Sequence, residues 1–292
     1  MTISIKQLHP HFVGALGPID LRGVHDSATL EDIRAGKDRY GVLVFHDQKF
    51  TDAEQLDFAQ RFDGTLHART STSVLVKNRF GNEALSDISN VGADGQLLTP
   101  DDRRRMTGLA NRLWHTDASF VDPAGRYSML YAHVIPPVAA DTEFADMRAA
   151  YDALDDATKA SLAGLKVHHS IAYSREVLGF EFAPAEKEQL KGAVHPLVRF
   201  FPRTGRKGLY LASHAASIID WRLPEGRLLL RDLMEHATKP EFVYSHPWSV
   251  GDFVIWDNRA TMHRARPFDD ARYRRELRRT TTLDIEPCAA AA

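Results

Sequence analysis

Short apolar runs bounded by turn residues predict β-strands along most of the chain. Gly41 to Phe45 is a short run of buried-strand type, and Tyr127 to Ile135 is a longer one. Pro196 to Phe201 and Gly208 to Ala212 are joined by a turn rich in polar residues, so they predict a hairpin. The sequence shows no internal repeat, no low-complexity segment and no interdomain linker.

Helical patterns are fewer than strand patterns. Thr51-Asp52-Ala53-Glu54 has the form of a capping box and predicts a helix that begins there. Asp146 to Leu165 predicts a pair of helices, and Pro224 to Ala237 predicts a helix with proline at its start. Pro100 to Met106 contains three consecutive arginines and predicts an exposed loop. Strands with peripheral helices predict a mainly β fold with peripheral α, a double-stranded β-helix or jelly roll.

Length and composition favour one globular domain. The chain has 292 residues, and we expect a single domain over residues 1–288 followed by a tail at 289–292. A formal net charge of −2 gives no electrostatic signature of nucleic-acid binding. The single cysteine, Cys288, excludes an intramolecular disulfide and favours a reducing compartment. No apolar run is long enough to span a membrane and no secretory leader is evident, so we expect a cytoplasmic protein.

The tripeptide His115-Thr116-Asp117 and the distant His263 form a candidate metal site. In an extended strand, residues two apart point to the same side, so His115 and Asp117 can address one ion while Thr116 faces away. Two imidazoles and one carboxylate are the ligands by which non-haem iron(II) oxygenases hold one face of the metal. The tripeptide alone is weak evidence, because a chain with 14 histidines and 39 acidic residues produces it by chance.

An arginine-rich segment near the end strengthens the site. The stretch from Arg272 to Leu283 has the character of a strand despite its charge. One face carries Arg275 and Arg279, about 13 Å apart by strand rise, so these two guanidinium groups can bind two separate carboxylates. The competing interpretation is a solvated basic edge strand. The candidate metal site nearby favours the anion-binding interpretation.

Four ordered motifs carry a family resemblance. They resemble the 2-oxoglutarate-dependent taurine dioxygenase superfamily and, within it, the 2,4-dichlorophenoxyacetate dioxygenases most of all. The resemblance is nearly full length, from the strand at Gly41 to the threonines at 280–282. The motifs are Leu113-Trp114-His115-Thr116-Asp117-Ala118-Ser119-Phe120, Asp141-Thr142-Glu143-Phe144-Ala145-Asp146-Met147, Trp256-Asp257-Asn258-Arg259-Ala260-Thr261-Met262-His263-Arg264 and Arg274-Arg275-Glu276-Leu277-Arg278-Arg279.

The resemblance implies an iron(II) enzyme that uses 2-oxoglutarate and O2 as cosubstrates, with ascorbate as a supporting reductant. Thr142 and Arg275 match the residues that bind 2-oxoglutarate, and Asn111 matches a polar position beside it. Arg279 matches the arginine that binds the anionic group of the primary substrate. Family members are often multimeric, so a homo-oligomer is expected. The implied iron ligands are His115, Asp117 and His263.

The spacing between His263 and the arginines leaves two registers open, because Arg274 and Arg278 form an alternative inward pair. His214 follows a strand and is a candidate for the substrate pocket. His168 and His169 are expected to be a surface pair or a hydrogen-bonded pair rather than ligands. Further residues are assigned to the core, to a contact with a ligand imidazole, and to a loop near the substrate. Trp114 and Trp256 are expected in the core, Asp257 or Asn258 beside a ligand imidazole, and Lys77, Asn78 and Arg79 in a substrate lid or a solvated loop.

Three functional hypotheses follow. The first is hydroxylation of a small aryloxyalkanoate next to its ether oxygen, which releases a phenol and a 2-oxo acid such as glyoxylate. The second keeps the chemistry but takes a sulfonate such as taurine, a sulfate ester or another small carboxylate. The third is a non-catalytic jelly-roll binding protein with a structural metal. The structural-metal hypothesis is disfavoured because only three protein ligands are expected here, whereas structural zinc sites usually have four.

Overall fold

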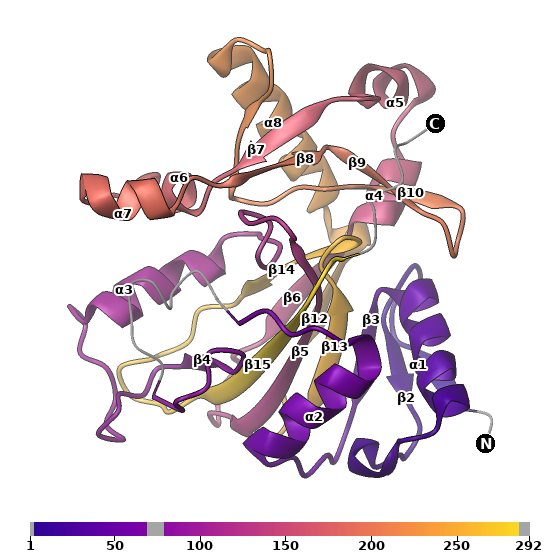
Figure 1. The fold of residues 1–292 in the computed structure, drawn as a ribbon, viewed down its shortest axis with the longest axis vertical. Helices are drawn as coiled ribbons and strands as arrows, with labels where there is room; N and C mark the ends of the chain where they lie inside the picture. The colour runs from indigo at the N-terminus through magenta and orange to yellow at the C-terminus, as the bar shows by residue number, and fades with distance from the viewer. Residues whose placement is uncertain (1–2, 69–78, 286–292) are drawn as a thin grey trace.

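A computed structural model describes residues 3–68 and 79–285 of the chain. It has a mixed α/β architecture with several antiparallel sheets (Figure 1). Two of the predicted features fall outside the described residues: Cys288 with the tail at 289–292, and Lys77 and Asn78 of the proposed lid. Among the described residues, no helix is long and apolar enough to cross a membrane.

The largest sheet has seven strands in the order β1-β2-β3-β13-β5-β15-β4 (Figure 1). Its neighbouring strands are antiparallel except for β2 and β3, which run parallel. The predicted strands at Gly41 to Phe45 and Tyr127 to Ile135 are confirmed as β3 and β5. The bounds are β1 Ile5–Gln7, β2 Gly14–Leu16, β3 Val42–Phe45, β4 Ser86–Ser89, β5 Gly125–Val134, β13 Phe253–Asp257 and β15 Glu276–Leu283.

Three smaller sheets complete the β structure. One has the order β12-β6-β14 and another β11-β7-β8, and β9 pairs with β10 as the predicted hairpin. All pairs within them are antiparallel. The bounds are β6 Thr142–Asp146, β7 Lys166–His169, β8 Ala193–Pro196, β9 Val198–Phe201, β10 Arg206–Leu209, β11 Ala215–Ile218, β12 Val243–His246 and β14 Thr261–Ala265.

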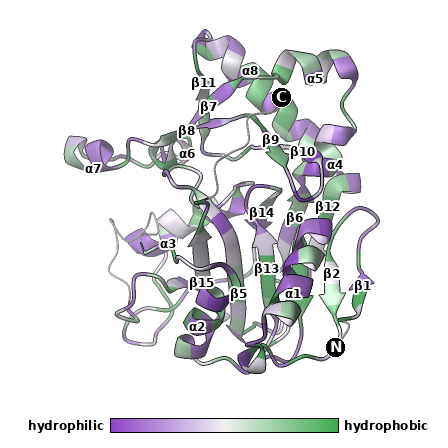
Figure 2. Ribbon diagram, turned by 45° about the vertical axis from the view of Figure 1, so that its right-hand side comes forward, coloured by the Kyte–Doolittle hydropathy of each residue, from purple (hydrophilic) through white to green (hydrophobic). Residues whose placement is uncertain are grey.

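Strand alternation divides the large sheet into two packed faces. Leu43 and Phe45 belong to a core cluster that includes side chains of the helices α1 (Ser27–Tyr40) and α2 (Asp52–Asp63). Val42 and Val44 face the other way and share a second cluster with Phe144 of β6. Because successive strand residues point to opposite faces, the wholly apolar run of β3 fits a strand covered on both sides. Hydrophobic residues likewise run along β13, whereas α7 is largely hydrophilic (Figure 2).

Most helices match their predicted positions. Thr51 and Glu54 form the expected capping box at the start of α2. The predicted pair appears as α4 and α5, and the leucine-rich helix appears as α8 with proline in its first turn. The remaining bounds are α3 Arg103–Gly108, α4 Met147–Asp152, α5 Asp156–Leu162, α6 Ile171–Glu176, α7 Pro184–Gln189, α8 Leu223–Ala237, η1 Leu21–Gly23, η2 Leu109–Arg112 and η3 Pro240–Phe242.

The predicted loop from Pro100 to Met106 is wrong over its second half. Arg103–Gly108 form the helix α3, and Asp102 caps it by accepting hydrogen bonds from the backbone N–H groups of Arg104 and Arg105. An aspartate cap followed by arginines, which favour helix, explains the helix. The segment carries no apolar stripe, so hydrophobic periodicity gave no sign of it.

Candidate metal centre and anion-binding cavity

Two distant segments meet at the candidate metal centre through their backbones. His115 and His263 form an isolated antiparallel bridge, with N–H to carbonyl distances of 3.0 and 2.8 Å. His263 lies in β14, but His115 lies outside any regular strand and Asp117 already begins a turn. The expectation of a full strand at His115 is therefore too simple. A single bridge is enough to set the two imidazoles side by side.

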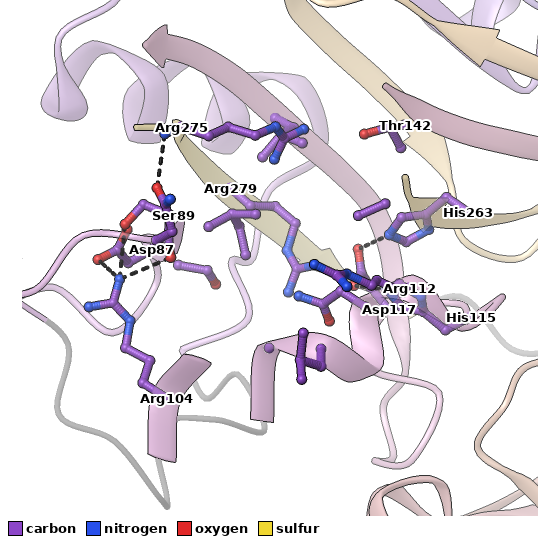
Figure 3. A pocket seen from close by; sticks show the side chains of 18 of the residues that line it. Asp87, Ser89, Arg104, Arg112, His115, Asp117, Thr142, His263, Arg275 and Arg279 are labelled. Atoms are coloured by element: carbon purple, nitrogen blue, oxygen red, sulfur yellow. Dashed lines mark hydrogen bonds and ion pairs between the residues drawn. The ribbon is translucent and has the colours of Figure 1, made fainter. Parts of the chain in front are cut away.

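The three predicted ligands converge (Figure 3). His115 Nε2 lies 3.9 Å from Asp117 Oδ1, and His263 Nε2 lies 3.6 Å from Asp117 Oδ2. One ligand atom from each residue lies within 4.8 Å of the others, and all three side chains are buried. The Nδ1 atom of His115 lies 2.8 Å from the carbonyl oxygen of Leu113, which fixes the ring and leaves Nε2 directed at the site. Thr116 faces away, as predicted, and its hydroxyl donates to the carbonyls of Asn258 and Thr261.

Asp117 is held at both carboxylate oxygens. Its Oδ2 accepts a hydrogen bond of 2.7 Å from the hydroxyl of Ser128 on β5, and its Oδ1 accepts one from the guanidinium of Arg279 on β15. Burial alone would raise the pKa of this carboxyl. Arg279, the two histidines and Ser128 outweigh burial and lower the pKa of Asp117 to about 2. The site therefore presents a carboxylate, not a carboxylic acid, at neutral pH.

Both imidazoles are kept in their neutral form. Burial lowers the pKa of His115, and burial together with the neighbouring His115 holds the pKa of His263 well below its usual value. A metal binds the lone pair of a neutral imidazole, so this environment favours coordination over protonation. The ring of His263 lies 4.7 Å from that of Trp256 and 6.1 Å from that of Phe144. These aromatic rings form a rigid apolar support behind the ligand.

Asn258 connects the two halves of the centre. Its Oδ1 accepts hydrogen bonds from the backbone N–H of Asp117 at 3.1 Å and from the indole of Trp256 at 3.0 Å. Its Nδ2 donates to the hydroxyl of Ser128 at 2.9 Å. The prediction that Asp257 or Asn258 contacts a ligand imidazole is wrong, because Asn258 holds the aspartate segment. Asp257 pairs instead with Lys37 and Arg259.

The centre opens into a cavity of about 230 Å³. Eight arginines line it, against three aspartates. Six of the eight form ion pairs with carboxylates. The pairs are Arg79 and Arg104 with Asp87, Arg105 and Arg112 with Asp270, Arg266 with Glu143, and Arg279 with Asp117. Within residues 3–68 and 79–285, Arg175 and Arg275 have no ion-pair partner.

Arg275 extends into the cavity toward Thr142 (Figure 3). Its backbone N–H donates to Asn90, but its Nε and Nη2 atoms are buried without a hydrogen-bond partner among the described residues. Burial lowers the pKa of Arg275 to about 10, so the guanidinium is still charged at neutral pH. Arg274 and Arg278 point elsewhere, to Glu276 and Asp52 respectively. The geometry favours the register in which Arg275 and Arg279 face the cavity.

Comparison with known proteins agrees with this geometry. The family model described as taurine catabolism dioxygenase TauD, TfdA family matches residues 4–281. The chain belongs to this family. It is 44% identical over 284 residues to the alpha-ketoglutarate-dependent 2,4-dichlorophenoxyacetate dioxygenase of Burkholderia sp. (strain RASC), covering 97% of this chain and 95% of the relative. The enzyme of the same description from Cupriavidus pinatubonensis (strain JMP 134 / LMG 1197) is 44% identical over 285 residues, covering 97% and 99%.

A solved structure is similarly close. The crystal structure of AAD-2 in complex with Mn(II) and N-oxalylglycine superposes with a TM-score of 0.89 at 46% identity, and 99% of each chain is covered. Both the sequence and the fold therefore match TauD, TfdA-family dioxygenases over nearly their whole length. Within the described residues of this family dioxygenase, His115, Asp117 and His263 form a group that could hold a metal ion.

The other predicted residues of the dioxygenase lie in or near the cavity, in the core or at hydrogen-bonded positions. Asn111 and His214 line the cavity, and the His214 ring lies 6.1 Å from that of His115. His168 and His169 are hydrogen-bonded as expected, to the carbonyl of Lys191 and the hydroxyl of Ser119. The expected core positions of Trp114 and Trp256 are confirmed, and Trp256 also borders the cavity. Arg79, the described member of the proposed lid, pairs with Asp87 and Glu276.

Three side chains at the site were missed by sequence reasoning: Ser128, Trp248 and Arg175. Ser128 had a recognisable pattern, since it and His133 are the polar residues in the mainly apolar strand from Tyr127 to Ile135. Trp248 donates its indole N–H to Thr142 Oγ1 at 2.9 Å, a contact between segments far apart in the sequence. Arg175 lies on the short helix α6, whose sequence carries no motif.

Proposed function

We propose that this protein is an iron(II)- and 2-oxoglutarate-dependent dioxygenase that hydroxylates a small aryloxyalkanoate next to its ether oxygen. The hydroxylated product is a hemiacetal that collapses to a phenol and a 2-oxo acid such as glyoxylate. 2-Oxoglutarate is converted to succinate and CO2. The observation that carries the proposal is a trio of two neutral imidazoles and a carboxylate, which opens into a cavity lined by an unpaired buried arginine.

The donor set fits iron(II). His115 and His263 supply neutral imidazole nitrogens and Asp117 supplies a hard carboxylate oxygen, a combination typical of iron(II) oxygenases. Three protein ligands leave positions open for small molecules, whereas a structural zinc site is usually closed by four. When bound, the metal supplies the oxidising chemistry with O2 and 2-oxoglutarate. The protein supplies orientation, which is its main contribution in cofactor chemistry.

Arg275 and Thr142 are suited to bind 2-oxoglutarate. Two nitrogen atoms of the buried Arg275 guanidinium lack a partner in the described chain, and a carboxylate matches its planar fork. Thr142 Oγ1 already accepts a hydrogen bond from Trp248, so its own proton is free for donation to a carboxylate oxygen. Asn111 borders the same cavity as a further polar contact. Arg275 thereby orients the cosubstrate by its charge, and Thr142 orients it by a hydrogen bond from its hydroxyl.

The choice of an aryloxyalkanoate rests on the cavity lining and on relatives. Apolar side chains border the cavity near the metal ligands, including Phe120 and Ile171, and they suit an aromatic ring. His214 and Arg279 are the polar residues we assign to the substrate side. The two 44%-identical relatives are named for action on 2,4-dichlorophenoxyacetate. The alternative is the same chemistry on taurine or another alkylsulfonate, a sulfate ester or another small carboxylate.

We also propose that residues 1–288 form one domain built on a double-stranded β-helix. In support, Phe144 of β6 packs in one cluster with Val42, Val44 and Val254 of the large sheet. The sheet β12-β6-β14 therefore shares a core with the face of the large sheet opposite α1 and α2. A jelly roll is this kind of sandwich of two antiparallel sheets.

The experiment measures oxygen consumption, succinate and phenol with iron(II), 2-oxoglutarate and ascorbate. The panel holds phenoxyacetates, their methyl esters, taurine, alkylsulfonates and sulfate esters at equal concentration. We expect phenol and succinate in equal amounts from the phenoxyacetates, and none from the variant His263→Ala. Turnover of sulfonates or sulfate esters alone would replace the substrate class, and 2-oxoglutarate-independent oxygen consumption would refute the reaction itself.

A further inference from the structure

Arg175 is a buried cation that the proposed iron and 2-oxoglutarate contacts do not use. It lies on α6, its residue is 5% exposed, and it lines the cavity that the metal centre opens into. Its Nη1 donates to the hydroxyl of Ser174 at 2.9 Å, while its Nε is buried without a partner among the described residues. No carboxylate of residues 3–68 or 79–285 forms an ion pair with it. The Arg175 guanidinium group therefore borders the cavity with a buried donor that has no partner in the described part of the chain.

An unpaired buried charge is costly, so its presence calls for a partner that arrives with a ligand. Burial alone lowers the pKa of Arg175 to about 10, and no acidic group offsets that effect. At neutral pH the group therefore keeps its positive charge. The other uncommitted arginine of the cavity is Arg275, which we assign to 2-oxoglutarate. Two uncommitted guanidiniums match two anionic ligands, a cosubstrate and a substrate.

The surroundings of Arg175 describe the ligand. His214 lies beside Arg175, because both side chains contact the Ser174 hydroxyl. Its Nδ1 lies 3.0 Å from the same Ser174 hydroxyl, and its ring makes an edge contact with Phe120 at 5.0 Å. Phe120 and Ile171 belong to an apolar cluster at this wall. Arg175 is thus a single charge set in an apolar wall.

We propose that Arg175 binds the anionic group of the primary substrate, a small organic carboxylate with an apolar body. Phe120 and Ile171 contact that body. This inference rests on the proposed function, because it assumes that a second small anion enters beside 2-oxoglutarate. It adds a second cation to Arg279, which we assign to the substrate side and which also contacts Asp117. It also places the anion on the α6 side of the metal ligands, where His214 lies beside His115.

The test compares wild type with Arg175→Gln, Arg175→Lys and the control Arg227→Gln. Arg227 lies on α8 and packs over the ring of Tyr173, which is on α6 like Arg175; the distance to the ring centroid is 4.7 Å. Arg227 does not line the cavity. Each protein is loaded with Mn(II) and N-oxalylglycine and titrated calorimetrically with phenoxyacetate, its methyl ester, an alkylsulfonate and an alkyl sulfate. Michaelis constants for 2-oxoglutarate and for the turned-over substrate are measured in parallel on the iron enzyme.

We expect Arg175→Gln to weaken binding of the acid at least about tenfold, the size of one lost charge-assisted hydrogen bond. Binding of the neutral ester should change little, so the preference for acid over ester disappears, which a merely structural role would not produce. The 2-oxoglutarate Michaelis constant should stay as in wild type, and Arg227→Gln should match wild type throughout. Arg175→Lys should retain part of the preference, because it keeps the charge without the planar fork.

The outcomes separate this inference from the proposed function. Equal acid binding by wild type and Arg175→Gln overturns the inference and leaves the function intact. Binding of sulfonate or sulfate alone, lost in Arg175→Gln, overturns the aryloxyalkanoate proposal and keeps Arg175 as the anion-binding residue. Failure of wild type to bind any of the anions overturns both. If Arg175→Gln does not fold, an unchanged acid-to-ester ratio in Arg175→Lys overturns the inference.

Discussion

Arg279 donates a hydrogen bond to Oδ1 of Asp117, the oxygen opposite the one that accepts from Ser128. The arginine expected to bind the substrate thus contacts the carboxylate expected to bind the metal. Arg279 reaches Asp117 from β15 and Ser128 reaches it from β5, and these two strands are neighbours in the large sheet. Both hydrogen bonds therefore fix the orientation of the carboxylate before any ligand enters. Metal binding and the arginine strand are coupled through this one side chain.

The first prediction concerns this coupling. Arg279→Gln should lower Mn(II) affinity about tenfold or more, because partners that orient a ligand carboxylate typically contribute that much. Metal titration monitored by protein fluorescence measures the effect. Arg278→Gln is the matched control, since Arg278 lies on the same strand but pairs with Asp52 and packs over Phe80. Unchanged metal affinity with a raised substrate Michaelis constant would return Arg279 to substrate binding alone.

Asn258 gives a second prediction. Asn258→Ala removes hydrogen bonds to the Asp117 backbone, Trp256 and Ser128 in a fully buried position. Each lost bond contributes about 1 kcal/mol, so unfolding free energy should fall by about 3 kcal/mol in urea titrations. Metal affinity should fall as well, because the segment that carries Asp117 loses its anchor. Asn258→Asp keeps the acceptor and loses the donor to Ser128, so its loss of stability should differ from that of Asn258→Ala. Equal stability of wild type and Asn258→Ala would contradict the anchoring role.

Much of the centre could be predicted from the sequence because it follows local rules. The spacing of His115 and Asp117 places these two ligands on one side of the backbone. Alternation along the arginine strand puts Arg275 and Arg279 on one face, but it leaves open whether that face or the one with Arg274 and Arg278 turns toward the cavity. Strand alternation needs only the next few residues, so it is readable in one dimension. The same reasoning located β3, β5, the hairpin and α8.

The rest depends on contacts between distant segments. Which arginines stay unpaired is decided by Asp87 and Asp270, which reach the cavity from β4 and from a turn. Nothing in the sequence distinguishes Arg175 from Arg104, yet Arg104 pairs with a carboxylate and Arg175 has no such partner among the described residues. Asn258 was placed near the metal correctly, but its true partner, the backbone of Asp117, is 141 residues away. No periodicity or motif encodes such pairings.

The third prediction concerns acid stability. Burial and the nearby Arg278 lower the pKa of His133 to about 4. Between its unfolded value near 6.5 and about 4, the unfolded chain binds a proton that the folded protein does not, so stability falls as pH falls through that window. The His133 ring is partly exposed, so we expect only about 1 kcal/mol from this residue after solvent screening.

Urea unfolding of metal-free wild type, His133→Gln and the exposed-site control His25→Gln measures this contribution at pH 7.5 and 4.5. The loss of unfolding free energy between the two pH values should be smaller in His133→Gln than in wild type, and unchanged in His25→Gln. Other buried histidines keep a residual pH dependence in all three proteins. An identical pH dependence in wild type and His133→Gln would show that this imidazole does not contribute.

The last prediction concerns the register of the arginine strand. Arg275→Gln should raise the Michaelis constant for 2-oxoglutarate at least about tenfold, because the lost pair is charge-assisted and buried. At saturating 2-oxoglutarate kcat should fall less than kcat/KM, since this contact is made equally in the ground state and the transition state. Arg274→Gln is the matched control. Its guanidinium pairs with Glu276 and is half exposed, so 2-oxoglutarate kinetics should stay near wild type.

Calorimetric titration of the Mn(II) enzyme with N-oxalylglycine gives the same comparison without turnover. Affinity should fall in Arg275→Gln and stay unchanged in Arg274→Gln. The opposite result would mean that the strand presents Arg274 and Arg278 to the cavity, and the pairing of Arg278 with Asp52 would have to break for that to occur. Neighbouring residues of a strand point to opposite faces, so Arg274 and Arg275 cannot both bind the cosubstrate. A large effect of one and a small effect of the other therefore fixes the register of Arg279 and of its contact with Asp117 at the same time.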